Sequence, residues 1–229
     1  MSKAISFKWT SGRFALIGSQ WAGALIVCFL LTACSQTKYH DRSPGFNEST
    51  IRSRGLIIGA VTSGTDAQIH NKQFEAKQFA EVVSEIHPEL NTVRLIDHID
   101  TRDYGLFLDI QNAYQSTGYL VPEDLSDISY LLGNRDSYVL FARLERESLN
   151  QDQSTVTTEN VKTTTYSSYR SVTLSFNIYD ANAEYRVWSG TITEDESISG
   201  YPVTALPPEQ ATVLRRVYEL FARDLLAPS

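Results

Sequence analysis

Cysteine is nearly absent from this chain of 229 residues. The two cysteines are Cys28 and Cys34, so everything after residue 34 lacks a thiol. That long segment can form neither a disulfide nor a cysteine metal site. Its core must therefore be stable without covalent cross-links, even in an oxidising compartment.

Histidine patterns typical of metal centres are also missing. The four histidines are His40, His70, His87 and His98. No two have the i, i+4 spacing of a helical metal site. His98 stands in Asp97-His98-Ile99-Asp100, but zinc needs three or four ligands, so we interpret this segment as a polar turn after a strand. His87 precedes a proline and indicates a helix end. We expect no metal and no cofactor.

Sequence motifs for catalysis are lacking too. Gly55-Leu-Ile-Ile-Gly59 is not followed by Gly-Lys-Ser/Thr, and no Gly-x-Ser-x-Gly elbow occurs. The turn Ser63-Gly64-Thr65-Asp66 could present amides to an anion, although such a cluster is more often a helix N-cap. Glu194-Asp195-Glu196 has no EF-hand spacing, and we interpret it as a solvated loop. We expect no catalytic residues; an enzyme site assembled from scattered Asp, His and Ser is the open alternative.

Positive charge is scarce beyond the first 33 residues. The whole chain has a formal net charge of −7, and residues 1–33 carry three basic residues and no acidic one, which leaves −10 for the remainder. Nucleic-acid binding requires clustered lysine and arginine. The charge balance therefore predicts no nucleic-acid partner.

The amino-terminal 33 residues have the pattern of a secretory signal peptide. A short apolar run covers residues 21–31, and no acidic residue occurs before Asp41. The basic residues upstream of the run are Lys3, Lys8 and Arg13. A membrane-spanning helix needs about 20 apolar residues. Extending the run back to Phe14 approaches that length but includes Ser19 and Gln20, so an uncleaved signal anchor is the alternative.

The run closes on Leu31-Thr32-Ala33-Cys34, which resembles the lipobox of bacterial lipoproteins. The resemblance implies a diacylglyceryl group on the Cys34 thiol, cleavage between Ala33 and Cys34, and acylation of the new amine. Two or more fatty chains anchor a protein stably in a bilayer. Ser35 at the second mature position implies the outer membrane of a Gram-negative bacterium, with the body facing the periplasm.

The remaining chain divides into a tether and one folded domain. Residues 34–54 are polar and predict a lipidated tether. Residues 55–229 predict a single α/β domain, with strands and helices that follow periods of 2 and 3.6 residues. We expect strands over 55–61, 92–96, 137–144, 172–179 and 184–193. We expect helices over 71–86, 106–114, 122–132 and 208–226.

This order predicts one mixed sheet of the α/β (α+β) class, with the order β-α-β-α-β-β-β-α and helices packed against it. Strands joined through helices should pair in parallel, and strands joined by a tight turn should pair antiparallel. Residues 147–169, rich in Ser, Thr, Gln and Asn, predict a polar loop or the tip of a protruding hairpin.

Side chains near the carboxyl end give weaker indications of an interaction site. Trp188, Tyr185 and Tyr201 could form an exposed aromatic patch, but a tryptophan on a hairpin of a small sheet is more often in the core. We interpret three arginines of the last helix as members of surface ion pairs, and Glu219 stands four residues before one of them, Arg223. They are Arg215, Arg216 and Arg223.

Segments 138–144, 176–180 and 186–190 resemble a group of periplasmic lipoproteins. The group comprises relatives of the curli secretion lipoprotein and of the penicillin-binding-protein activator lipoproteins, whose domain is similar to the amino-terminal domain of the Tol translocation propeller protein. The shared pattern is an apolar strand, a strand ending in Asp before a turn, and a strand with Val-Trp before Gly. The sequence departs from the activators because residues 35–54 are not proline-rich. It departs from the curli channel because residues 147–169 have no lipid-facing apolar stripe.

These features predict a lipid-anchored lipoprotein that binds an envelope protein in envelope assembly, wall synthesis or secretion, without catalysis. Its partners would be the membrane, through the lipid on Cys34, and an envelope protein. A subunit of an oligomeric secretion channel and an envelope enzyme are the alternatives.

Overall fold

The computed structural model describes residues 36–63, 72–90, 92–133, 135–158, 161–200 and 208–227. The described strands are β1 (Gln36–Arg42), β2 (Leu56–Ser63), β3 (Thr92–Arg94), β4 (Tyr138–Thr158), β5 (Val161–Asp180) and β6 (Tyr185–Gly200). The described α-helices are α2 (Glu48–Arg54), α3 (Lys72–Ile86), α4 (Tyr104–Thr117), α5 (Pro122–Leu131) and α6 (Gln210–Leu225). Two short 3₁₀ helices, Leu95–His98 and Thr101–Asp103, connect β3 to α4. No helix within the described ranges is long and apolar enough to cross a bilayer.

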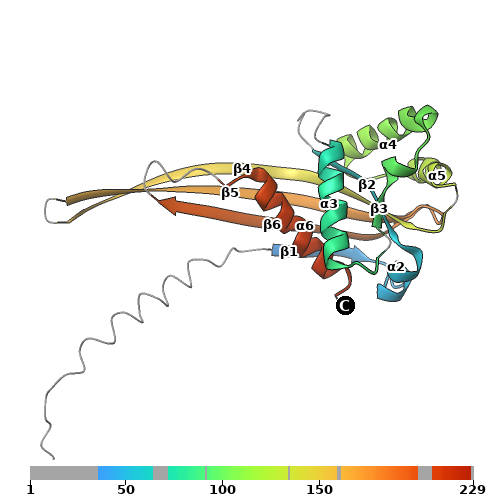
Figure 1. Cartoon of the computed structure of the whole chain (residues 1–229), viewed down its shortest axis with the longest axis horizontal. Coiled ribbons are helices and arrows are strands. Elements are labelled where there is room, and N and C mark those ends of the chain that lie inside the picture. The colour runs from blue at the N-terminus through green and yellow to red at the C-terminus, as the bar shows by residue number, and fades with distance from the viewer. Residues whose placement is uncertain are drawn as a thin grey trace, which may run out of the picture. The chain divides into compact units, whose positions relative to one another are not determined.

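The described strands form one mixed sheet in the order β1-β6-β5-β4-β2-β3 (Figure 1). β2 runs parallel to β3 and to β4, since helices connect these strands, whereas β4, β5 and β6 pair antiparallel through tight connections. The predicted fold class is confirmed, and the strand expected over 137–144 begins β4, which lies inside the sheet between β5 and β2.

The segment predicted as a tether is instead partly built into the fold. Residues 36–42 form β1, which pairs antiparallel with β6, and residues 48–54 form α2. Asn47 caps α2 by accepting a hydrogen bond from the backbone N–H of Thr50, and Ile51 is fully buried. The prediction failed because β1 is a polar edge strand, held by backbone hydrogen bonds to β6 rather than by an apolar pattern of its own.

The predicted polar loop over 147–169 is also not a loop. β4 and β5 remain paired out to Thr158 and Val161, so the alternative of a protruding hairpin is the one that the structure shows. The acidic run at 194–196, interpreted as a loop, continues β6 and pairs with β5. Small polar side chains allow a strand where a neighbouring strand supplies backbone partners, and the single sequence does not reveal such partners.

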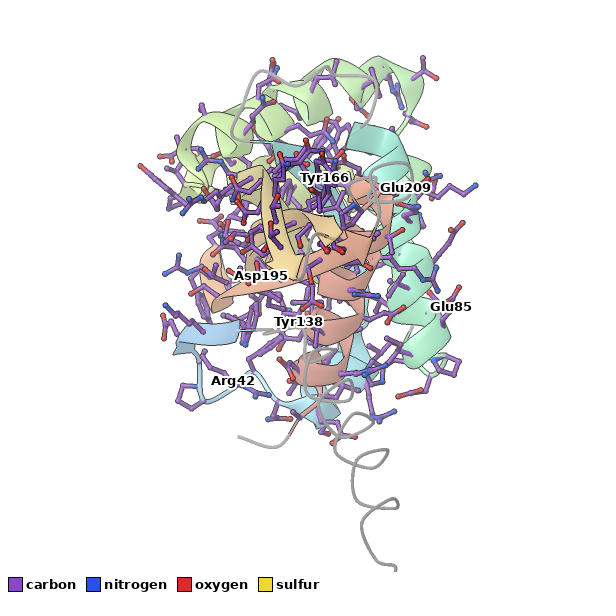
Figure 2. The ribbon with its side chains drawn as sticks, turned by 90° about the vertical axis from the view of Figure 1, so that its left-hand side faces the viewer. Arg42, Glu85, Tyr138, Tyr166, Asp195 and Glu209 are labelled. Carbon is purple, nitrogen blue, oxygen red and sulfur yellow. The ribbon has the colours of Figure 1, made fainter. Side chains whose placement is uncertain are left out.

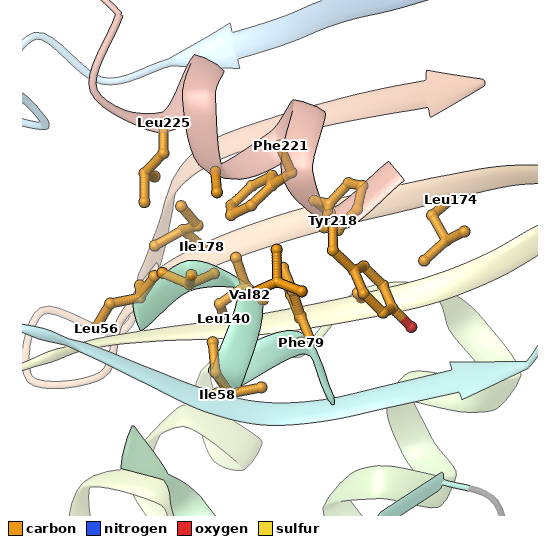
Figure 3. Packing of buried hydrophobic residues seen from close by; sticks show 14 of the residues in the cluster. Leu56, Ile58, Phe79, Val82, Leu140, Leu174, Ile178, Tyr218, Phe221 and Leu225 are labelled. Atoms are coloured by element: carbon orange, nitrogen blue, oxygen red, sulfur yellow. The ribbon is translucent and has the colours of Figure 1, made fainter. Parts of the chain in front are cut away.

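The face of the sheet under α3 and α6 carries the larger hydrophobic core (Figure 3). Aromatic rings link the two helices to the sheet: Phe79 stacks on Tyr218 with 4.7 Å between ring centroids, and Phe176 stacks on Phe221 at 4.5 Å. Trp188 meets Phe221 edge-on at 5.5 Å and is 2% exposed, as predicted for a core tryptophan. This packing fixes the middle of β5 and β6.

The opposite face carries a second core under α4 and α5. The Tyr114 hydroxyl donates to the carbonyl of Phe141 at 3.1 Å and accepts from the side-chain amide of Asn177 at 2.9 Å. Tyr179 accepts from the backbone N–H of Leu120 at 3.1 Å. Burial raises the pKa of Tyr114 and the pKa of Tyr179, the latter to about 12. Both phenols therefore remain protonated and can donate hydrogen bonds.

Candidate interaction surfaces

The predicted lipidation site, Cys34, and the recognition residues Leu31, Thr32 and Ala33 lie outside the described residues. The chain enters the sheet at Gln36, which is in register with Thr193 of β6. β1 then runs away from that point to Arg42, which is in register with Trp188. Only Ser35 separates Cys34 from the first strand.

The close fit of β1 against β6 depends on a glycine. A Cβ atom added to Gly190 would lie 2.7 Å from the ring of Trp188 and 3.3 Å from the carbonyl oxygen of Lys38. Because Trp188 is packed against Phe221, its ring cannot move away at low cost. Gly190 therefore lets the core tryptophan and the amino-terminal strand occupy the same stretch of β6.

A three-stranded extension, here called the ribbon, projects beyond the rest of the sheet (Figure 1), and its end faces the viewer in Figure 2. It consists of residues 145–158 of β4, 161–172 of β5 and 194–200 of β6. β2 pairs with β4 only as far as Leu144, and β1 pairs with β6 only as far as Thr193. Within the described ranges no strand covers the outer edge of β4 or of β6 along the ribbon, so both edges present unpaired backbone groups.

A network of charged side chains fixes the base of the ribbon to α6. Arg170 donates to Glu147 at 2.8 Å, and the side-chain amide of Gln210 donates to the second oxygen of the same carboxylate at 2.8 Å. Arg216 pairs with Glu196 at 3.1 Å. These contacts join all three ribbon strands to the first turns of α6, so the ribbon leaves the core in a defined direction.

Glu194 is the most buried carboxylate near this network. It is 4% exposed, and one of its oxygens has no hydrogen-bond partner among the described residues. Burial raises its pKa, and the nearby guanidinium of Arg216 opposes that shift only in part. The predicted solvated loop is thus wrong in this respect as well: Glu194 lies inside the molecule, on the face that α6 covers.

A hollow of about 580 Å³ lies between α3 and the edge strand β3. Asp97 and His98 line it, but Asp100 does not. The Asp97 carboxylate accepts from Arg94 at 2.8 Å, and the Asp100 carboxylate accepts from Arg102 at 3.0 Å. The segment forms a short 3₁₀ turn after β3, in agreement with the polar turn predicted from the sequence, and it brings together no chemical centre.

The other candidate residues of the sequence that lie in the described ranges make contacts that stabilise the fold. α3 ends at Ile86, and a ring nitrogen of His87 lies 2.7 Å from the carbonyl oxygen of Ala222. Arg215 pairs with Glu85 at 2.6 Å and with Glu219 at 3.2 Å, so Glu219 pairs with Arg215 rather than with Arg223.

Tyr201 and residues 64–66 lie outside the described residues, as do the side chains of His40 and His70. No group of three metal-binding side chains occurs in the described part of the chain.

Three side chains around α5 are exposed although the sequence did not predict it. Tyr119, Val121 and Tyr130 are 53%, 40% and 64% exposed. Each stands in an apolar segment in which neighbouring residues are buried, so the sequence pattern alone assigns them to the core. The helical period over 122–131 does place Tyr130 opposite Leu125 and Ile128, and that was the available signal.

Comparisons with known proteins give low similarity. No protein-family model matches the chain, and a search of curated proteins finds no match. Among solved structures, the PelC dodecamer from Paraburkholderia phytofirmans is 12% identical, with a TM-score of 0.44 over 86% of this chain and 100% of that chain. Lipoprotein GNA1162 from Neisseria meningitidis is 11% identical, with a TM-score of 0.34 over 75% of this chain and 96% of that chain. Similarity at this level carries no statement about function or assembly.

Proposed function

We propose that this chain is a lipoprotein of the bacterial envelope, anchored through lipid on Cys34, which binds a protein partner and catalyses no reaction. The observation that carries the proposal is the start of β1 at Gln36, two residues after the cysteine of the lipobox-like motif. Two residues of chain span at most about 7 Å. A lipid on Cys34 would therefore leave no long tether between the bilayer and the first strand of the folded body.

The direction of β1 indicates on which side of the domain the anchor would lie. β1 begins on the side of the sheet from which the ribbon projects, because Gln36 is in register with Thr193 and the ribbon begins at residue 194. The anchor and the ribbon would thus share one side of the domain. α4 and α5 lie at the other end (Figure 1). With Ser35 after the cysteine, we place the protein at the outer membrane, facing the periplasm.

The described surface supports binding rather than chemistry. Asp97 and Asp100, the carboxylates of the enzyme alternative, are each held by an arginine, which leaves neither as a free base. The ribbon, by contrast, offers about 45 Å of strand, from the fourteen β4 residues beyond Leu144. Free strand edges of this kind are used in protein recognition by strand addition.

Replacing the lipidation site tests the proposal. Cys34→Ala removes the thiol that would carry the diacylglyceryl group, so we expect the full-length variant to be uncleaved or released from washed outer membranes, with no incorporated palmitate. The wild-type protein should remain with the membrane and incorporate labelled palmitate. Cys28→Ala is the matched control and should behave as the wild type. Unchanged labelling of the Cys34→Ala protein would refute the anchor.

A second candidate is a subunit of an oligomer in secretion, and the two free edges of the ribbon favour it. An edge of β4 on one copy could pair with an edge of β6 on the next, which would satisfy both sets of backbone groups. Light scattering on detergent-extracted protein separates the candidates. A multiple of the monomer mass supports the oligomer, and a monomer supports the binding protein.

A further inference from the structure

The exposed large apolar side chains of the described residues fall into two groups, one on the ribbon and one at the end of the domain that carries α5. Seven large apolar side chains are exposed, and four of them are Tyr119, Val121, Tyr130 and Tyr185. The first three flank or belong to α5. Tyr185 follows the turn between β5 and β6, and that turn touches α5 because the Ser129 hydroxyl donates to the side chain of Asn182 at 2.9 Å.

α5 has two distinct faces. Its inward face buries Leu125, Ile128 and Leu131 in the second core. Its outward face presents Glu123, Asp127 and Tyr130, which are spaced i, i+4 and i+7 and so follow one another along the helix. We call these three residues, together with Tyr119, Val121 and Tyr185, the α5 patch.

Acidic side chains predominate along α4 and α5, although Arg102 lies near Tyr130 and Arg186 follows Tyr185. From Tyr104 to Gly133 the chain contains four carboxylates and no lysine, arginine or histidine; the acidic residues are Asp109, Glu123, Asp124 and Asp127. Asp124 is used locally, because its carboxylate accepts from the backbone N–H of Val121 at 3.0 Å. Within the described ranges no lysine or arginine forms an ion pair with Glu123 or Asp127, so these two charges are available to a partner.

Both kinds of side chain in the patch select the same partner chemistry. Carboxylates attract ammonium and guanidinium groups, and the face of a tyrosine ring attracts the same cations. Exposed tyrosines within an otherwise polar surface are also typical anchors of protein interfaces. We infer that the α5 patch is the docking surface for a lysine- or arginine-rich segment of an envelope protein. This inference rests on the proposed function, because the anchor would leave the α5 end of the domain directed away from the bilayer.

Photocrosslinking in the native envelope tests the inference. Full-length, membrane-anchored protein carries p-benzoylphenylalanine in place of Tyr130, and a control carries it in place of Lys77 on α3, whose side chain is 60% exposed. We expect Tyr130 to crosslink to one envelope protein through a peptide with a net positive charge, with a yield that falls as salt is raised to about 0.5 M. No crosslink at Tyr130, or a crosslink to an acidic peptide, to lipid or to polysaccharide, would overturn the inference.

Charge-reversed variants give an independent readout. Glu123→Lys with Asp127→Lys should lower the Tyr130 crosslink by about tenfold. Glu81→Lys with Asp41→Lys makes the same change in net charge away from the patch and from the ribbon, and should leave the yield within about twofold. Equal losses in both double variants would overturn the inference. Because each variant is scored in the membrane fraction, loss of the anchor appears as loss of the protein from that fraction and is distinct from loss of docking.

Discussion

Arg54 joins three parts of the chain that are distant in sequence. At the end of α2, its guanidinium donates to Asp180 at 2.7 Å, forms an ion pair with Asp136 at 2.7 Å, and lies over the ring of Tyr138 with 4.0 Å to the centroid. Burial opposes the ionisation of Asp180, but the hydrogen bonds from Arg54 and from the backbone N–H of Ala183 outweigh it, so the pKa of Asp180 is lowered. These contacts fix the end of α2 to the start of β4 and to the end of β5.

Arg54→Met should therefore destabilise the domain markedly. Removing one member of a largely buried pair leaves the Asp180 charge without its partner, at a cost of about 2–4 kcal/mol in the free energy of unfolding. The stabilisation of ionised Asp180 exists above the usual aspartate pKa of about 3.9 and is lost as the pH falls through its lowered value. The difference in stability between wild type and variant should thus shrink on acidification, as measured by urea unfolding between about pH 7 and pH 3.

Arg52→Met is the matched control on the same helix. Arg52 pairs with Glu48 and Glu89 at the surface, where solvent screens the charges. Its replacement should change the unfolding midpoint little at any pH. Equal effects of the two substitutions, or an Arg54 effect that persists at low pH, would contradict the role assigned to the Arg54–Asp180 pair.

The ribbon is an element that the body of the domain does not need for its own stability. Its far half carries exposed side chains, and the larger hydrophobic core reaches only its base, at Val172. A variant that joins Asn150 to Tyr169 through an Asn-Gly turn keeps the register of this pair and removes residues 151–168. We expect its melting temperature, followed by near-UV circular dichroism, to lie within about 3 °C of the wild type.

The same shortened variant should lose any assembly or strand-mediated binding. Unchanged oligomeric mass and unchanged partner recovery would show that the ribbon has no part in recognition. A large fall in melting temperature would show instead that the ribbon contributes to the fold, in conflict with its exposed composition.

The elements differ in how well the sequence predicted them. Residues 172–178 alternate apolar and polar side chains, and the last helix has an apolar face around Val213 and Phe221, so both could be predicted from periodicity. β1 and the ribbon could not, because their residues are polar and their pairing depends on backbone contacts with distant strands. α2 was missed because a single buried side chain, Ile51, holds its seven residues in place.

The interaction surfaces were less predictable than the fold. The sequence drew attention to Asp97, His98 and the acidic run at 194–196, and the structure gives these residues positions in a turn and in a strand. The α5 patch was not predicted, because exposure of Tyr130 depends on which helix face the sheet covers. A sequence shows which residues could take part in binding or catalysis, but which surfaces remain exposed to solvent depends on tertiary packing.

At the scale of the whole molecule, one axis relates the proposed anchor, the sheet and the α5 patch. The chain leaves β1 on the ribbon side, and α4 and α5 cover the opposite end (Figure 1). The net charge of −10 after residue 33 disfavours binding of the body to anionic lipid by charge, so attachment would depend on the lipid alone. A domain held in this way presents its acidic helical end to the periplasm.

Intact-mass spectrometry of the protein extracted from native membranes tests this account most directly. The account predicts a chain that begins at Cys34 and carries a diacylglyceryl group on the thiol and an acyl chain on the amine. A chain that retains Met1, or that begins at another residue without lipid, would contradict it.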